Sequence, residues 1–162
     1  FAQKAQLFEN VKDGEFVCVE QGLGDDFYIP RVGRGCASGD LDNDGDLDLV
    51  LTCLNGHPAI LRNDGGNANH WLQLSLEGTR SNRMAIGAVA RMECGGRKQM
   101  REVRSQSSFL SQNSPVLHFG LGSHAQAERI EIQWPSGAKT VLENVKADQR
   151  LFIREEAKES AP

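Results

Sequence analysis

Apolar and polar residues alternate along much of this chain with a period of two, which is the pattern of half-buried β-strands. The clearest examples are residues 70–76 and 127–134. One face of each carries apolar side chains only: Leu72, Leu74 and Leu76 in the first, and Ile130, Ile132 and Trp134 in the second. Turn residues separate such runs at the roughly 8–12-residue spacing that is typical of β-sandwiches and barrels. The pattern predicts an all-β protein, and the 17 glycines agree with a turn-rich chain.

The first third of the chain predicts a small sheet made of short hairpins. The turn Lys12-Asp13-Gly14 joins the first two strands, because Asp-Gly between two such runs is a strong hairpin signal. Residues 21–32 are rich in Gly and Asp and are predicted to be a loop. The five strands expected in this region are 5–10, 15–19, 33–39, 49–54 and 59–63. We interpret residues 1–66 as one small sheet element.

A second and larger set of strands follows residue 66. These strands are expected at 70–76, 85–94, 98–105, 116–122, 127–134, 138–145 and 149–154. About seven strands with turns of this kind predict a β-sandwich. The charged residues 155–162 are typical of a frayed chain end. The predicted organisation is therefore a small sheet element over 1–66, a β-sandwich over 67–155 and a flexible tail over 156–162.

One nine-residue stretch carries five carboxylates at alternate positions: Asp40, Asp42, Asp44, Asp46 and Asp48. At the effective dielectric near a protein surface, each close pair of like charges costs on the order of a few kcal/mol. Ca²⁺ takes six to eight oxygen ligands and accepts carboxylates from a flexible loop. Gly45 supplies the sharp turn that such a loop needs. The spacing therefore predicts a calcium loop, in preference to a solvated acidic turn without an ion.

The loop departs from the EF-hand pattern at its end. The twelfth position, where an EF-hand carries a bidentate Glu, is Leu51. Asp48, at the ninth position, is the natural closing carboxylate, and the apolar run 49–54 predicts an exiting strand rather than a helix. We expect the ligands to be the side chains of Asp40, Asp42, Asp44 and Asp48 with the backbone carbonyl of Asp46.

Charge and hydropathy disfavour several classes of partner. The net charge is −4 and the acidic loop contributes −5, so the rest of the chain sums to +1 and gives no basic excess for nucleic acid. No apolar stretch has transmembrane length, and no signal-peptide pattern opens the chain. The start at Phe1 indicates a processed protein or a cut-out fragment. Calcium loops of modest affinity belong mainly outside the cytosol, so we expect a secreted protein, extracellular or periplasmic.

The four cysteines, Cys18, Cys36, Cys53 and Cys94, match no zinc or Cys-x-x-Cys spacing. Cys36 and Cys53 flank the acidic loop and could face each other across a hairpin, where an oxidising compartment would allow a disulfide. Free thiols that act as small apolar side chains are an equally good interpretation.

Residues 39–50 read Gly-Asp-Leu-Asp-Asn-Asp-Gly-Asp-Leu-Asp-Leu-Val, and this stretch resembles the FG-GAP/VCBS repeat of β-propeller blades. In that family the Asp-x-Asp-x-Asp-Gly-x-x-Asp loop binds calcium, which implies the same ligand set as above. The Phe-Gly-Gly-Ala-Pro string of the repeat is not present, and a single such loop occurs. Because a propeller has about four to eight blades, the resemblance implies the end of a longer propeller. The resemblance also implies that residues 1–66 are one propeller-blade-like sheet element, the blade element. We expect the faces of this lone blade to pack on the sandwich or on another copy of the chain.

The second region resembles the ASPIC/UnbV domain, which follows FG-GAP/VCBS propellers in bacterial secreted proteins and in the cartilage acidic protein family. The strings that carry the resemblance are 69–72, 81–83 with 85–88, 101–105, 117–122 and 134–137. They read Asn-His-Trp-Leu, Ser-Asn-Arg with Ala-Ile-Gly-Ala, Arg-Glu-Val-Arg-Ser, Leu-His-Phe-Gly-Leu-Gly and Trp-Pro-Ser-Gly. The family has no assigned reaction, so the resemblance implies extracellular binding or adhesion.

The remaining constellations favour a binding module over an enzyme. Metal coordination already accounts for the clustered carboxylates that a glycosidase would need, and no nucleophile-elbow motif accompanies Ser107 and His118. Loop 105–114 is rich in amides and hydroxyls and carries Phe109 and Leu110, so it is either a recognition surface or a structured connection.

Two further groups of residues are interpreted as structural. Trp71 and Trp134 are expected in the core or at a domain junction. A basic face is interpreted as solvated rather than anion-binding, and its members are Arg91, Arg97, Lys98, Arg101 and Arg104.

The sequence therefore predicts a calcium-binding extracellular interaction or adhesion module that is not an enzyme, with calcium in a structural role. Its expected partner is a protein or glycan, without nucleic-acid binding or membrane insertion, and with self-association through the blade element. Two alternatives remain open. The first is a carbohydrate-binding module that uses loop 105–114, and the second is an accessory part of a larger secreted enzyme.

Overall fold

The computed structural model describes residues 1–12, 14–109 and 111–157. Within these residues the protein consists of twelve strands in four sheets and two short 3₁₀-helices, which confirms the predicted all-β class. Neither of those helices, nor any other in the described part, has the length and apolar character needed to cross a bilayer.

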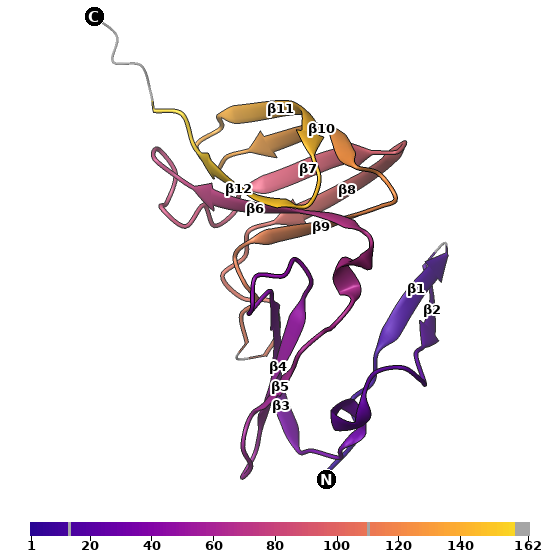
Figure 1. Ribbon diagram of the computed structural model, residues 1–162. Coiled ribbons are helices and arrows are strands. Elements are labelled where there is room, and N and C mark those ends of the chain that lie inside the picture. The colour runs from indigo at the N-terminus through magenta and orange to yellow at the C-terminus, as the bar shows by residue number, and fades with distance from the viewer. Residues whose placement is uncertain (13, 110, 158–162) are drawn as a thin grey trace, which may run out of the picture.

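The first 66 residues form two small antiparallel sheets. Strands β1 (Phe8–Lys12) and β2 (Glu15–Cys18) make a hairpin, and η1 (Asp25–Tyr28) follows. Strands β3 (Gly33–Gly39), β4 (Asp48–Cys53) and β5 (Ala59–Leu61) make a sheet in that order. The β1–β2 hairpin lies to one side of the three-stranded sheet (Figure 1). Asp13, in the turn predicted for the hairpin, lies outside the described residues.

The sandwich region follows the 3₁₀-helix η2 (Gly66–Ala68). Its strands are β6 (His70–Glu77), β7 (Val89–Cys94), β8 (Arg97–Glu102), β9 (Leu117–Gly122), β10 (Gln126–Gln133), β11 (Lys139–Lys146) and β12 (Gln149–Arg154). One sheet has the order β11-β10-β7-β8 and the other has the order β12-β6-β9, with β12 parallel to β6. The two sheets lie one above the other (Figure 1).

The main hydrophobic core lies between these two sheets. The predicted apolar faces point into it, since Leu72, Leu74, Ile130 and Ile132 are all 0% exposed. Full burial of one such side chain contributes about 1.5–3 kcal/mol, so the alternation that defines the strands also supplies the stability of the sandwich. By contrast, the hairpin leaves large apolar side chains exposed: Leu7, Phe8, Val11, Phe16 and Val17.

Strand β7 is shorter than predicted. It begins at Val89 instead of residue 85, because Ala85 (φ 54°) and Gly87 (φ 91°) adopt left-handed backbone conformations that interrupt the extended backbone of a strand. The preceding residues form a turn in which the Ala88 N–H donates to the Ala85 carbonyl.

The hairpin β3–β4 does not bring Cys36 and Cys53 together. Cys36 lies opposite Leu51, and Cys53 lies opposite Gly33, with a register shift between Gly33 and Gly35. All four cysteines of the chain fall within the described residues and are free thiols.

Glu155, the last residue of the predicted sandwich, is fixed in the fold, although it also opens the charged run 155–162 that is typical of a frayed end. The residue is only 2% exposed, and its carboxylate lies in the turn after β6. Oε2 accepts hydrogen bonds from three consecutive backbone N–H groups, those of Thr79, Arg80 and Ser81, at 3.0, 2.9 and 2.7 Å. Oε1 accepts from the hydroxyls of Ser81 and Ser136. This cradle fixes the end of β12 beside β6, while residues 158–162 of the predicted tail lie outside the described part.

Candidate metal centre

The acidic loop connects β3 to β4, at the end of the three-stranded sheet that faces the sandwich (Figure 1). Two of its residues have left-handed backbone conformations, Asn43 at φ 63° and Gly45 at φ 101°. Asn and Gly tolerate this region better than other residues, so the sequence Asp-Asn-Asp-Gly permits the tight reversal. A Cβ atom built on Gly45 would overlap the indole of Trp71. Glycine is therefore required here both by the backbone and by the neighbouring sandwich.

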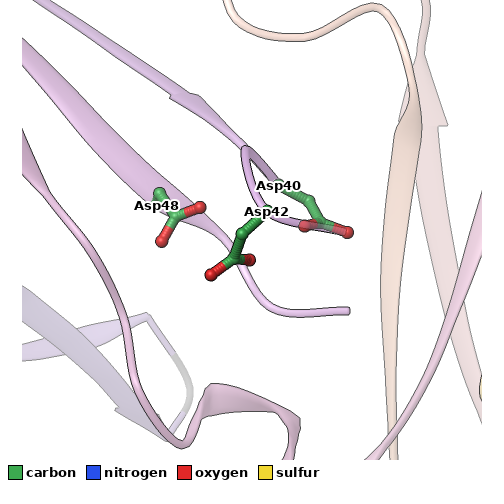
Figure 2. Close-up of side chains that lie close together, drawn as sticks. All are labelled: Asp40, Asp42 and Asp48. Atoms are coloured by element: carbon green, nitrogen blue, oxygen red, sulfur yellow. The ribbon is translucent and has the colours of Figure 1, made fainter. Parts of the chain in front are cut away.

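Three of the predicted ligand carboxylates lie together. One oxygen from each of Asp40, Asp42 and Asp48 falls within 4.8 Å of the other two. Figure 2 shows the three side chains gathered where the loop meets β4. Ca²⁺–oxygen distances are about 2.3–2.6 Å, so two ligands of one ion are at most about 5 Å apart. The spacing of the three carboxylates is compatible with a single shared cation.

Hydrogen bonds hold two of these carboxylates in place. Asp48, 1% exposed, accepts from the backbone N–H of Leu41 at 2.8 Å and of Asn63 at 2.9 Å. Asp40, whose side chain is 4% exposed, accepts at Oδ2 from the backbone N–H of Gly45 at 3.2 Å. Its other oxygen, Oδ1, is buried without a hydrogen-bond partner. A buried, unpartnered carboxylate oxygen is costly, and a bound cation would remove that cost.

The other two predicted residues point elsewhere. Asp44 is exposed, and its Oδ1 accepts from the backbone N–H of Asp46 at 3.1 Å. Asp46 is 2% exposed, and its Oδ2 accepts from the N–H groups of Gly65 and Gly66 at 3.2 and 3.0 Å. The pKa of Asp46 is raised above its ordinary value, chiefly because the carboxyl is buried and also because the charges of Asp44 and Asp48 repel it. The hydrogen bonds from the two glycine N–H groups lower the pKa and offset part of this rise. The side chain of Asp44 and the carbonyl of Asp46 stay predicted ligands.

The sandwich contacts the loop through side chains from three strands. From β6, Gln73 Nε2 donates to Asp40 Oδ2 at 2.7 Å. From β12, Arg150 Nη2 lies 3.3 Å from the same oxygen. From β9, His118 Nε2 donates to the carbonyl of Gly45 at 2.9 Å, and its ring stacks on Trp71 with the centroids 6.4 Å apart. Sequence reasoning missed the parts played by Gln73, His118 and Arg150, because each occupies an ordinary polar position in an alternating strand.

The two tryptophans occupy the places predicted for them. Trp134 is 2% exposed in the core, where its Nε1 donates to Thr140 Oγ1 at 2.9 Å. Trp71 lies at the junction between the loop and the sandwich, against Gly45.

Loop 105–114 also meets the first region. Asn113 Oδ1 accepts from the backbone N–H of Ser38 at 3.0 Å, and the N–H of Ser114 donates to the Ser38 carbonyl at 2.9 Å. These contacts favour the interpretation of the loop as a structured connection. Phe109 is 69% exposed, while Leu110 lies outside the described residues.

The basic face is partly neutralised by neighbouring carboxylates. Lys98 Nζ lies 3.0 Å from Glu93, and Arg104 Nε lies 2.9 Å from Glu102. The guanidinium of Arg101 sits 5.5 Å from the centre of the Phe119 ring. Such pairing agrees with a solvated face, which stays a prediction.

The fold and the site define an all-β protein in which an acidic hairpin loop is hydrogen-bonded to a two-sheet sandwich. The family model described as ASPIC and UnbV matches residues 78–160, and the chain belongs to this family. The chain is 31% identical over 146 residues to cartilage acidic protein 1 of Mus musculus and, at the same identity, to that of Homo sapiens. Each match covers 88% of this chain and 22% of the relative.

A further relative is cartilage acidic protein 1 of Xenopus tropicalis, which is 32% identical over 109 residues. That match covers 65% of this chain and 16% of the relative. The chain therefore spans about a fifth of the length of the curated relatives that it matches.

Proposed function

We propose that the loop Asp40–Asp48 binds one Ca²⁺ and that this chain is a non-catalytic extracellular interaction module in which the ion is structural. One observation carries the proposal. The buried Oδ1 of Asp40 has no partner, in a loop where three carboxylate oxygens lie within 4.8 Å of one another.

The chemistry of the donors supports calcium over softer metals. All the grouped donors are carboxylate oxygens, which hard cations prefer, and the loop backbone offers further carbonyls. Asp40, Asp42 and Asp48 would hold the ion. The side chain of Asp44 and the carbonyl of Asp46 would complete its shell as the loop adjusts. Calcium tolerates such a flexible, irregular loop better than Mg²⁺, which demands near-ideal octahedral geometry.

A structural role fits the position of the carboxylates better than a catalytic one. Asp40 and Asp48 are buried and already accept hydrogen bonds from the loop backbone and from Asn63. A bound ion would cancel the repulsion among the charges and stiffen the turn between β3 and β4.

The likeness of this chain to other proteins supports the proposed setting. The curated relatives are named cartilage acidic protein 1, which supports an extracellular setting. The resemblance of residues 39–50 to FG-GAP/VCBS loops supports a propeller-type blade that precedes the sandwich. We propose a protein or glycan as the ligand of the module, and self-association through the exposed hairpin β1–β2.

Calcium titration with a matched pair of variants tests the proposal. We expect isothermal titration calorimetry on the full chain to give one bound Ca²⁺. At a calcium concentration about 100 times the dissociation constant, binding stabilises the fold by about 2.7 kcal/mol. For a chain of this length that corresponds to roughly 5–10 °C in melting temperature, which EDTA should reverse.

The variants separate coordination from overall charge. Asp42→Asn removes an exposed member of the cluster and should weaken binding by roughly tenfold or more, since affinity follows the number of charged ligands. Asp25→Asn removes the same charge from exposed η1 and should leave the affinity unchanged. A melting curve that EDTA does not move, or equal binding by both variants, would show the proposal to be wrong.

A further inference from the structure

Gln73 is a buried amide whose hydrogen bonds lead to the acidic loop. It is 1% exposed on β6, between Leu72 and Leu74, which are 0% exposed. A buried amide is costly unless its polar atoms are paired. Both ends of Gln73 are paired: Nε2 donates to Asp40 Oδ2 at 2.7 Å, and Oε1 accepts from Arg150 Nε at 2.6 Å.

Arg150 fixes the orientation of that amide. It lies directly opposite Gln73 in the parallel pairing of β12 with β6. Because the guanidinium only donates, the oxygen of the Gln73 amide must face Arg150, and the NH₂ group must face Asp40. Arg150 Nη2 also lies 3.3 Å from Asp40 Oδ2. The neighbouring strands β6 and β12 therefore present a preset pair of donors to one carboxylate oxygen of the loop.

The two carboxylate oxygens of Asp40 differ in their hydrogen bonding. Oδ2 receives hydrogen bonds from Gly45, Gln73 and Arg150, whereas Oδ1 receives none and is buried. Holding one oxygen in this way sets the rotation of the carboxylate and keeps the other oxygen free for a cation.

We propose that Gln73, oriented by Arg150, is a positioning residue for the metal loop. Calcium affinity of the blade then depends on the sandwich, and calcium in turn tightens the docking of the loop on the sandwich. The second half of this statement follows from the first, because coupling between two binding events is reciprocal. The inference rests on the proposed calcium function and adds that the sandwich sets the calcium affinity of the loop.

Other contacts give the docking a rigid base. The N–H of His118 holds the Gly45 carbonyl at 2.9 Å, and the indole of Trp71 closes against Gly45. Because these contacts do not use Asp40, the loop should stay near the sandwich when Gln73 is changed, and only the setting of the carboxylate should be lost.

The test compares two glutamines of the sandwich whose side-chain amides each donate a hydrogen bond of 2.7 Å. Gln73→Met keeps the length of the side chain and removes both the amide donor to Asp40 and the amide acceptor of Arg150. Gln99→Met removes another amide donor of the sandwich. Gln99 Nε2 donates to the Gly120 carbonyl at 2.7 Å, and this hydrogen bond does not involve the acidic loop. Removing a group that hydrogen-bonds to a metal ligand lowers metal affinity by about 10- to 100-fold. We expect that loss for Gln73→Met by calorimetry and wild-type affinity for Gln99→Met.

Two further readouts exclude a merely structural effect. The rise in melting temperature on adding calcium should shrink in Gln73→Met, whereas the melting temperature in EDTA should change far less. Hydrogen exchange of the Ser38 and Ser114 amides, which bridge the two regions, should slow on adding calcium in the wild type and less in Gln73→Met.

The outcomes separate the two proposals. A wild type that binds no calcium overturns the proposed function itself. If the wild type binds calcium and the Gln73→Met variant binds it with equal affinity, only the positioning role is overturned. If Gln73→Met does not fold, Arg150→Lys decides, because it keeps the charge of a partly exposed side chain but loses the Nε–H that orients Gln73. An Arg150→Lys variant that binds calcium as tightly as the wild type would also overturn the positioning role.

Discussion

The cradle around Glu155 makes a quantitative prediction for the variant Glu155→Gln. Burial raises the pKa of this carboxyl, but hydrogen bonds from the Ser136 hydroxyl and from the backbone N–H groups of Ser81, Arg80 and Thr79 together lower it by more than burial raises it. The net result is a folded-state pKa of about 2, against an ordinary value of 4.5. The ionised form is therefore the one that the fold stabilises.

The magnitude follows from linkage between ionisation and folding. Each pKa unit is worth about 1.4 kcal/mol, so the lowered pKa of Glu155 contributes on the order of 3 kcal/mol to folding at neutral pH. Because the folded pKa lies below the unfolded one, this contribution is complete above about pH 4.5 and is lost as the pH falls towards 2. Glutamine at this position resembles the protonated acid and cannot accept all five hydrogen bonds. We expect Glu155→Gln to lose about 3 kcal/mol at pH 7 and almost nothing relative to the wild type near pH 2.

Urea denaturation in EDTA, followed by circular dichroism from pH 7 to the acid limit of folding, measures this difference without interference from calcium. Glu156→Gln is the matched control, since Glu156 is the next residue and is exposed. The control should match the wild type throughout. A loss in Glu155→Gln that stays the same at pH 7 and pH 3, or no loss at pH 7, would refute the account of the cradle.

Two further predictions concern the first 66 residues, which form the hairpin β1–β2 and the sheet β3-β4-β5. Gly45→Ala should destabilise the protein by about 1–3 kcal/mol in thermal melts, because its left-handed backbone and the indole of Trp71 both resist a methyl group. Gly137→Ala has a similar φ but open space, so an equal loss in both variants would exclude the contact with Trp71 as a cause. Sedimentation velocity should detect association of the wild type that Phe16→Ser weakens, since Phe16 is 62% exposed on the hairpin. The control Phe152→Ser removes a comparably exposed ring from the sandwich, and equal weakening by both would contradict association through the hairpin.

The strands of this protein could be predicted from sequence because their alternation is strong. Leu72, Leu74, Ile130 and Ile132 all lie in the core as their spacing requires, and the predicted seven-stranded sandwich is present in the described residues. The start of β7 was mispredicted because Ala85 is a poor signal for a left-handed turn. Alternation assigns each residue to a face, but it does not report the backbone angles that end a strand.

The polar partners of the acidic loop could not be predicted in the same way. Alternation places Gln73 on the face opposite Leu72 and Leu74, and such a face is usually solvated. In this protein that face is covered by the loop, and the covering contact is made by Asp40, which is 33 residues earlier in the chain. Likewise, Glu155 belongs to a charged segment, and only the fold brings the turn at Thr79–Ser81 to it. Burial of polar groups by distant segments leaves no periodic trace in the sequence.

The parallel pairing of β12 with β6 has a consequence for biosynthesis. Gln73 and Arg150 are separated by 77 residues, and Asp40 and Arg150 by 110. At translation rates of about 5–20 residues per second, the acidic loop is made several seconds before the guanidinium that bonds to it. During synthesis, β12 is therefore the last strand of the described fold to become available, and its pairing with β6 is the last strand pairing that can form.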